Sequence, residues 1–390
     1  MPTRLFDDIE RTDATPAREE DSFTFLNRVA TPYWDRVRSF AEEAFGAYPR
    51  EHAADLRARF RDRRWSTHIG AWWELYLYTL FRSLGLEVEV HPRLSGVTRR
   101  PDFLVGSDEN SFFVEARHVA AGLRSDEGRI GRDEWITAPL DDLTHPDFMV
   151  AVRIVERASQ RPRRTAVTRG VLAWLDSLDA DAVAARPEAR QSFSARAGGW
   201  RFELSALPVK PEARGRERRL VGIYPGYGGT DNTAASLRAA LKEKAARYGR
   251  TGSPFILAPL LTSGFVNIED VLSALFGTEV MRISIDAPEQ TTMSRAPDGF
   301  WVSGEGFRGT RISAILLGDT VLPWTVGRSL PRLWIHPAAA HPLPDVPLLP
   351  TATVDSAGDL SLSDGGRTGS DVFGLADGWP GPEGPFDISA

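Results

Sequence analysis

The 390-residue chain contains no cysteine. This absence excludes disulfide scaffolds, thiolate metal sites and cysteine nucleophiles. No stretch approaches the roughly 18 consecutive apolar residues of a membrane span. The opening Met-Pro-Thr-Arg-Leu-Phe-Asp-Asp also has no apolar signal core. We therefore expect a cytoplasmic protein with no membrane partner.

Lysine is scarce as well. Lys210, Lys242 and Lys244 are the only lysines among 47 basic residues. Because arginine serves wherever a generic positive charge suffices, each remaining lysine is a mild pointer to a position that needs an ammonium group. The seven histidines show no ligand spacing such as His-x-x-x-His. We therefore interpret them, including His118, as structural or exposed.

The net charge of −6 arises at the C-terminal end of the chain. Residues 351–390 hold seven acidic residues and one arginine, so the preceding residues are neutral overall. Within them arginines cluster at 61–64, 161–164 and 214–219, in patterns that fit either phosphate contacts or solvated loops. We expect the acidic tail to be flexible. One further hypothesis is that it covers a basic groove as an internal nucleic-acid mimic.

Hydrophobic periodicity and composition divide the chain into six segments. A loose arm over about 1–22 opens the first segment, and the pattern from 121 to 231 reads as an insertion that separates two parts of one core. The predicted segments are an N-terminal arm with helices (1–64), a first core part (65–120), an α+β insertion (121–231), a second core part (232–285), a mixed C-terminal region (286–350) and the acidic flexible tail (351–390).

Two carboxylates are expected to face each other on a hairpin. A polar turn at 107–110 separates the β-prone runs 103–105 and 112–114. If the ends of the turn are opposite each other, Asp102 is opposite Glu115, with Cβ atoms roughly 5 Å apart. Like charges at this spacing are destabilising, so we expect a cation between them. The apolar flanks of Glu115 indicate a covered position, where a carboxylate must be paired or hold a metal.

Helical periodicity places another acid and a lysine on inward faces. A helix is predicted over about 69–83, and Glu74 lies on its apolar stripe rather than on its solvent face. A second helix is predicted over 233–248, where Lys244 and Tyr248 continue the spacing of two apolar leucines. An inward lysine is costly unless it meets negative charge. The acids of the hairpin are the obvious partners.

Four short motifs now stand in a recognisable order. They are Glu74 in the first helix, Pro101-Asp102 at the second strand of a meander, Glu115-Ala-Arg117 in its third strand, and Lys244-Ala-Ala-Arg-Tyr248 in the second helix. This order resembles the PD-(D/E)xK nuclease-like superfamily, and the last motif is similar to the Q-x-x-x-Y motif of its RecB-like branches. The resemblance covers roughly 65–120 and 232–262.

The resemblance implies a fold class and a metal site. The expected fold is α/β, with a restriction-endonuclease-like core of mixed sheet flanked by helices, a large α+β insertion, N-terminal helices and a mixed C-terminal region. In this family the acids matching Asp102 and Glu115 hold Mg²⁺ (or Mn²⁺), often with the carbonyl of the residue matching Ala116. The acid matching Glu74 helps directly or through water. Such an ion supplies much of what phosphodiester hydrolysis requires.

The chain departs from the family pattern at Arg117, which stands where the superfamily has lysine. Arginine does not readily release a proton, although its guanidinium can clamp a phosphate with two hydrogen bonds. Some branches of the superfamily supply the lysine from the second helix, where Lys244 has the required face. Arg117 and Lys244 are thus both candidate catalytic residues beside Asp102 and Glu115. Arg117 and Tyr248 are candidate contacts to nucleic acid.

The resemblance predicts a metal-dependent endonuclease that hydrolyses DNA phosphodiester bonds, in defence or genome maintenance. The alternative is a catalytically degenerate module of the same fold, which binds nucleic acid or a protein partner without cutting. The sequence leaves a protein partner and a homo-oligomer open. It also leaves open whether Arg117 or Lys244 replaces the motif lysine.

Overall fold

The structure is a computed structural model of the whole chain, and it divides into two compact units. One unit comprises residues 1–121 and 232–390, and the other comprises residues 122–231. The residues that the structure describes are 4–11, 20–94, 100–107, 110–119, 135–137, 139–140, 142–185, 191–209, 211, 214–215, 218–223, 233–247, 251–262, 268–282, 292–319, 321–344, 346, 349–355 and 359–381.

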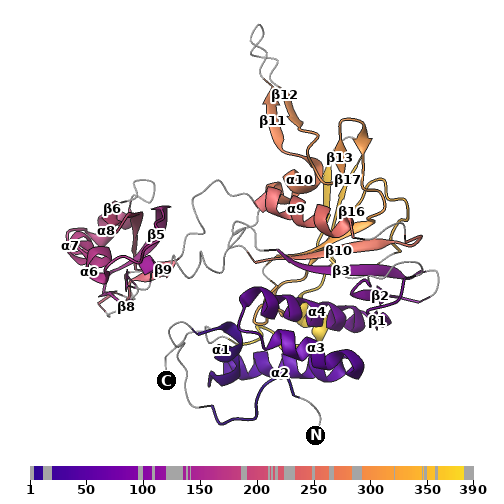
Figure 1. Cartoon of the computed structure of the whole chain (residues 1–390), viewed down its shortest axis with the longest axis horizontal. Coiled ribbons are helices and arrows are strands. Elements are labelled where there is room, and N and C mark those ends of the chain that lie inside the picture. Colours follow the sequence, from indigo (N-terminus) through magenta and orange to yellow (C-terminus); the bar gives the residue numbers. More distant parts are fainter. Residues whose placement is uncertain are drawn as a thin grey trace. The chain divides into compact units, whose positions relative to one another are not determined.

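The larger unit is built on an eight-stranded mixed sheet of order β1-β2-β3-β10-β15-β16-β17-β18 (Figure 1). The strands are β1 (Val88–Val90), β2 (Phe103–Val105), β3 (Phe112–Val119), β10 (Phe255–Leu261), β15 (Ala314–Asp319), β16 (Arg332–Ile335), β17 (Thr351–Val354) and β18 (Leu360–Ser363). Strand β10 is parallel to both β3 and β15, and β16 is parallel to β17. The remaining neighbours are antiparallel.

Helices cover both faces of this sheet (Figure 1). One face carries α1 (Ser22–Arg28), α2 (Pro32–Ala47), α3 (Arg50–Phe60) and α4 (Trp65–Ser83), and the other carries α9 (Thr233–Ala245) and α10 (Ile268–Phe276). Strand β10 has buried side chains on both faces, with Ile256 towards α4 and Leu257 towards α9. Its apolar run is therefore that of a central strand, and the fold is mixed α/β.

Helix α4 is the most deeply buried helix of the N-terminal layer. Its residues Trp72, Trp73 and Tyr76 are fully buried. The Trp73 Nε1–H donates to the Ala258 carbonyl of β10 at 2.8 Å. Because buried indole N–H groups need acceptors, this bond fixes α4 against the centre of the sheet. The helix ends at Ser83, and Gly85, with a φ of +80°, follows its C-cap residue Leu84.

The first described residues pack against the helical layer, in contrast to the predicted loose arm. Leu5 and Phe6 are buried, and their backbone N–H groups donate to the Glu42 carboxylate at 3.0 and 2.7 Å. Asp7 forms an ion pair with Arg61 at 2.9 Å. The arm prediction is wrong for residues 4–11, because two adjacent apolar residues are too short a signal for periodicity analysis.

The predicted flexible tail is wrong for the described parts of residues 351–390. Strands β17 and β18 extend the large sheet, and α11 (Gly369–Phe373) follows them. The rings of Phe373 and Trp379 lie 5.3 and 5.7 Å from that of Phe40 on α2. The described acids of the tail are exposed, whereas Ala352, Val372 and Trp379 enter the core. The described residues of the tail are thus packed in the larger unit, and they do not form the loose segment that the groove-covering hypothesis requires.

The smaller unit has its own core. A four-stranded sheet of order β6-β7-β5-β9 packs with short helices. Its elements are β4 (Thr144–His145), β5 (Phe148–Glu156), α6 (Arg164–Thr168), α7 (Val171–Asp176), α8 (Ala180–Ala184), β6 (Ser192–Ala197), β7 (Trp200–Pro208), β8 (Arg218–Arg219) and β9 (Val221–Ile223). Helices α6 and α7 are separated at Gly170, whose φ is +76°.

Two small hairpins complete the larger unit. Strands β11 (Glu279–Arg282) and β12 (Thr292–Arg295) pair antiparallel, as do β13 (Val302–Ser303) and β14 (Gly306–Phe307). Among the described residues, every helix is too short or too polar to cross a lipid bilayer.

The packing of the C-terminal residues predicts a stabilising role for Trp379. Trp379→Ala should lower the free energy of unfolding by about 3–5 kcal/mol, because it removes a buried aromatic ring. Urea denaturation measures the change, with the exposed Asp377→Ala as a control expected within about 0.5 kcal/mol of wild type. A Trp379 variant as stable as the control would contradict the described packing.

Candidate active site

Glu74 of α4 is buried and already has two strong partners. Its side chain is 6% exposed, and its Oε2 lies 2.8 Å from Nη1 of Arg59 on α3. Its Oε1 accepts a hydrogen bond from the Tyr48 hydroxyl at 2.7 Å. The His91 Nε2 lies 3.8 Å from the same oxygen. The prediction that Glu74 lies on the inward stripe of its helix is confirmed, and the N-terminal helices provide its partners.

Asp102 directly precedes β2, and the observed strand register continues to it. Phe103 pairs with Val114, so the next pair outward is Asp102 with Glu115, as the count from the turn predicts. The Ala116 N–H donates to Asp102 Oδ2 at 2.6 Å. The Asp102 carboxyl therefore turns across the hairpin onto the strand that carries Glu115.

Glu115 lies on the face of β3 that α9 covers, and it forms an ion pair with Lys244 of that helix. The two side chains are 4% and 11% exposed. Leu237 and Leu241 of α9 are buried against the sheet, and Lys244 follows them on the same inward face of the helix. The expected cation beside the hairpin acids is thus Lys244. A buried carboxylate at this position requires such a partner.

Arg117 lies two residues beyond Glu115 but closer to solvent. Its Nη2 is 3.3 Å from the Glu243 carboxylate of α9, and the two side chains are 40% and 46% exposed. Exposed ion pairs of this kind contribute roughly 0–1 kcal/mol. Arg117 is therefore held loosely at the rim, whereas Lys244 is held firmly inside. Tyr248, the other predicted contact to nucleic acid, lies outside the described residues.

Several of these side chains line a cleft of about 500 Å³, and Glu115 lies beside it through its ion pair with Lys244. Its walls combine two acids and three strongly basic residues with a floor of small residues from α4. The lining residues are Arg59, Ser66, Thr67, Gly70, Ala71, Glu74, Asp102, Ala116, Arg117, His118 and Lys244. The small residues leave room above the carboxylates, and the bases give the cleft an affinity for anionic groups.

The Asp102 carboxyl bears an electrostatic penalty. Burial raises its pKa well above its usual range, and the negative charges of Glu115 and Glu74 raise it further. Lys244 and the Ala116 N–H lower the pKa of Asp102, but it stays above the usual range of an aspartate. A cation that entered the cleft would therefore stabilise the charged form of Asp102.

His118 lines the cleft as a neutral side chain, although its sequence context gave no functional signal. Its Nε2 lies 2.7 Å from the Thr262 hydroxyl. Burial, with a smaller effect of Arg117, lowers the pKa of His118 to about 4. A neutral imidazole at this position adds no charge to the cleft near neutral pH.

The sequence did not identify Arg59 and Tyr48 as site residues. Both come from the N-terminal helical layer, and both contact Glu74. The available signal for Arg59 was its position between the buried residues Leu56 and Phe60 of α3, which brings the base of its side chain close to the inward face. For Tyr48, which follows α2, the sequence carries no comparable signal.

Within the described ranges, no three Asp, Glu or His side chains converge closely enough to form a ready-made metal cage. The three predicted ligands nevertheless lie within electrostatic reach of one another, since both Glu74 and Glu115 act on the pKa of Asp102. Two of them have cationic partners in Arg59 and Lys244. A metal ion would share or replace these partners.

Removal of the charge on Asp102 is expected to stabilise the protein, whereas most substitutions destabilise it. Asp102→Asn should increase stability at pH 7 in EDTA, because the amide removes a charge that burial and the neighbouring acids Glu115 and Glu74 disfavour. A raised pKa in the folded state means that the wild type loses stability as pH rises above the ordinary aspartate range. The advantage of the variant should therefore disappear towards pH 4. Urea midpoints over this pH range measure it.

Asp298→Asn is the matched control. Burial alone would raise the pKa of Asp298, but hydrogen bonds from Thr278 and Arg238 outweigh it and hold the pKa below its usual range. This substitution should therefore destabilise the protein at pH 7. A loss of stability in both variants would contradict the assignment of an electrostatic penalty to Asp102.

Comparisons with known proteins add no assignment. No protein-family model matches the chain, no curated protein matches it, and no solved structure matches it. The interpretation of the cleft therefore depends on its own geometry and chemistry.

Proposed function

We propose that this protein is a metal-dependent nuclease that hydrolyses DNA phosphodiester bonds. The observation that carries the proposal is the ion pair between Lys244 and Glu115, beside a cleft that Asp102 and Glu74 line. A lysine supplied by α9 is what a variant PD-(D/E)xK site with arginine at position 117 requires. Defence or genome maintenance would be the corresponding biological setting.

The order of elements supports a restriction-endonuclease-like core. Helix α4 precedes the antiparallel meander β1-β2-β3, and α9 precedes β10, which returns parallel to β3. The smaller unit, residues 122–231, is inserted between β3 and α9. This arrangement agrees with the family order of helix, meander, helix and strand on which the resemblance rests.

The donor set of the cleft fits a hard divalent cation. Asp102 and Glu74 line the cleft and Glu115 lies beside it, so three carboxylates offer the oxygen ligands that Mg²⁺ and Mn²⁺ prefer, and thiolate ligands are absent from the sequence. Burial and the charges of Glu115 and Glu74 raise the pKa of Asp102, so a cation beside this carboxyl would stabilise its charged form. Asp102, Glu115 and Glu74 would hold the ion, which would neutralise charge on the scissile phosphate.

The basic residues of the cleft have distinct parts in this proposal. Lys244 Nζ carries three N–H donors, so it can remain bonded to Glu115 while it orients a water or stabilises charge on a phosphate oxygen. Arg117 is half-exposed at the rim, where its guanidinium can clamp a neighbouring phosphate. Arg59 holds the Glu74 carboxylate in position from the opposite wall.

The second candidate function is a nuclease-like module that binds nucleic acid or a protein without cutting. It is favoured by the fact that Lys244 and Arg59 already neutralise two of the three acids. In that case the basic side chains would substitute permanently for a metal ion. Arginine at position 117 is consistent with the same loss of turnover.

Substitution of the buried pair tests the proposed activity. With plasmid or oligonucleotide DNA and Mg²⁺ or Mn²⁺, Glu115→Gln and Lys244→Met should each reduce cleavage at least about 100-fold, because both act on developing charge. Arg117→Gln should reduce cleavage less, about 10-fold, since Arg117 is half-exposed at the rim of the cleft. Glu89→Gln on the exposed edge of β1 is the control. Activity that survives Glu115→Gln would come from another site or a contaminant.

Metal-linked stability distinguishes the two candidate functions. Mg²⁺ at about 100 times its Kd should stabilise the wild type by about 2.7 kcal/mol, because a ligand that binds only the native state shifts the unfolding equilibrium. Asp102→Asn and Glu115→Gln should reduce or abolish this response. Thermal unfolding in MgCl₂ against KCl of equal ionic strength measures it. An unresponsive wild type would favour the non-catalytic module.

A further inference from the structure

A second basic cavity, of about 570 Å³, lies at the C-terminal end of α9. It is separate from the cleft, since the two cavities share no lining residue. The segment 308–312, just before β15, forms most of its wall. Its lining residues are Lys242, Ala245, Phe300, Arg308, Gly309, Thr310, Arg311 and Ile312.

The three cations of this cavity have no carboxylate partner among the described residues. Lys242, Arg308 and Arg311 form no ion pair there, whereas Arg59, Arg61 and Arg117 nearer the N-terminus all do. Three like charges around one cavity repel one another. An anion in the cavity would relieve that repulsion.

Backbone carbonyls hold both guanidinium groups in place. Arg311 Nη2 donates to the Ala245 carbonyl, at the end of α9, at 2.6 Å. Arg308 Nη2 donates to the Gly299 carbonyl. Each bond uses one of the five N–H donors of an arginine and leaves its charge uncompensated. The side chains are therefore fixed in orientation without being neutralised, which lowers the entropy cost of binding an anion.

The segment that carries these arginines is itself rigid. The Arg308 N–H donates to the Trp301 carbonyl at 2.8 Å, and the Ala340 N–H donates to the Thr310 carbonyl at 2.7 Å. Gly309, with φ of +71°, allows the intervening turn. His336 adds a further contact, because its Nε2 lies 2.9 Å from the Arg308 carbonyl.

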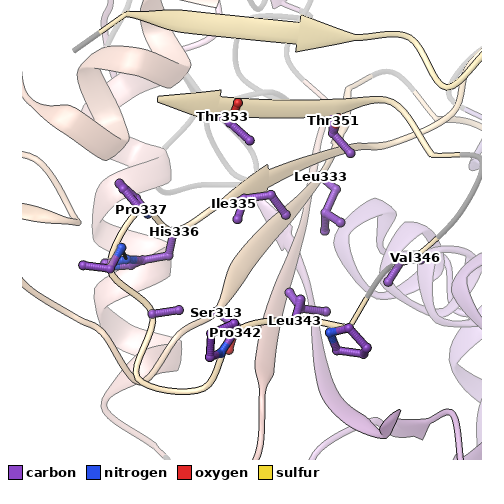
Figure 2. Close-up of a pocket in the computed structure, with 13 residues that line it drawn as sticks. Ser313, Leu333, Ile335, His336, Pro337, Pro342, Leu343, Val346, Thr351 and Thr353 are labelled. Atoms are coloured by element: carbon purple, nitrogen blue, oxygen red, sulfur yellow. Dashed lines mark hydrogen bonds between the residues drawn. The ribbon is translucent and has the colours of Figure 1, made fainter. Parts of the chain in front are cut away.

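Figure 2 shows that His336 also borders a neighbouring cavity of about 440 Å³. The labelled side chains around it are aliphatic, proline or hydroxyl groups apart from His336. The His336 Nδ1 accepts from the Ala338 N–H at 2.9 Å, so both ring nitrogens are engaged. That neighbouring cavity offers no charge to a ligand, and His336 serves to position the Arg308 segment.

We propose that Lys242, Arg308 and Arg311 form a phosphate site for the backbone of a nucleic acid. The nucleic-acid identity of the ligand rests on the proposed function, whereas the preference for phosphate rests on the uncompensated charges. Lys242 and Lys244 are two residues apart on α9, about 3 Å along the helix axis. Lys244 faces the cleft and Lys242 faces the second cavity. The C-terminal end of α9 thus presents one ammonium group to each cavity, so each can contact a different phosphate of one nucleic-acid backbone.

Equilibrium binding of a DNA duplex in EDTA tests the site without catalysis. Lys242→Gln and Arg308→Gln should each weaken binding about 3- to 10-fold and reduce the slope of log K against log salt concentration by about 1. Lys242 is exposed, so its variant should fold as the wild type does. Arg308→Lys, which retains the charge, should recover part of the affinity. Arg82→Gln, an exposed arginine at the end of α4, should leave affinity and slope unchanged.

The outcomes separate this inference from the nuclease proposal. Wild-type binding with unchanged affinity and slope in both glutamine variants would overturn the phosphate site and leave the nuclease proposal intact. If the wild type does not bind DNA, the nuclease proposal fails, and thermal unfolding in inorganic phosphate against chloride then tests the site alone. Stabilisation by phosphate that is lost in Lys242→Gln would retain an anion site for a small phosphate ligand. Equal responses of wild type and variant would overturn it.

Discussion

The buried ion pair between Glu115 and Lys244 is the interaction on which the arrangement of the larger unit depends. Strand β3 lies between two helical layers, so a lone carboxylate on it would cost several kcal/mol. Lys244 compensates that charge only if α9 lies across β3. The parallel pairing of β10 with β3 brings the chain back to where α9 can do so. Loss of either partner would leave an uncompensated buried charge, at a cost of about 3–5 kcal/mol.

A second acid–base pair lies on the opposite side of the same strand end. Glu74 and Arg59 belong to the N-terminal layer, which covers the other face of the sheet. Asp102 lies between these two pairs, and among the described residues its carboxyl accepts a hydrogen bond from the Ala116 N–H. The two flanking acids are thus stable without any ligand, and the central acid is not. This asymmetry places the demand for positive charge at the centre of the cleft.

Local periodicity was enough to predict the hairpin register and the inward positions of Glu74 and Lys244. These features depend on residues close in sequence, where the periods of strands and helices fix the direction of each side chain. The contact of Arg59 with Glu74 depends instead on how α3 packs against α4, which no local pattern encodes. The same limit explains the tail, since its strands pair within a sheet whose order is set by distant segments. Composition alone gave the wrong prediction there.

The distribution of lysine supports a functional reading of α9. Two of the three lysines in the chain lie on this helix, and they face two different cavities. At Glu115 a compact ammonium is better suited than a guanidinium, because the pair is almost fully covered and a planar fork with five donors would leave several of them unsatisfied. Arginine suits the rim and the second cavity, where its remaining donors reach solvent or a ligand. For Lys244 and Arg117, the residue type therefore follows from how much of the charge is enclosed.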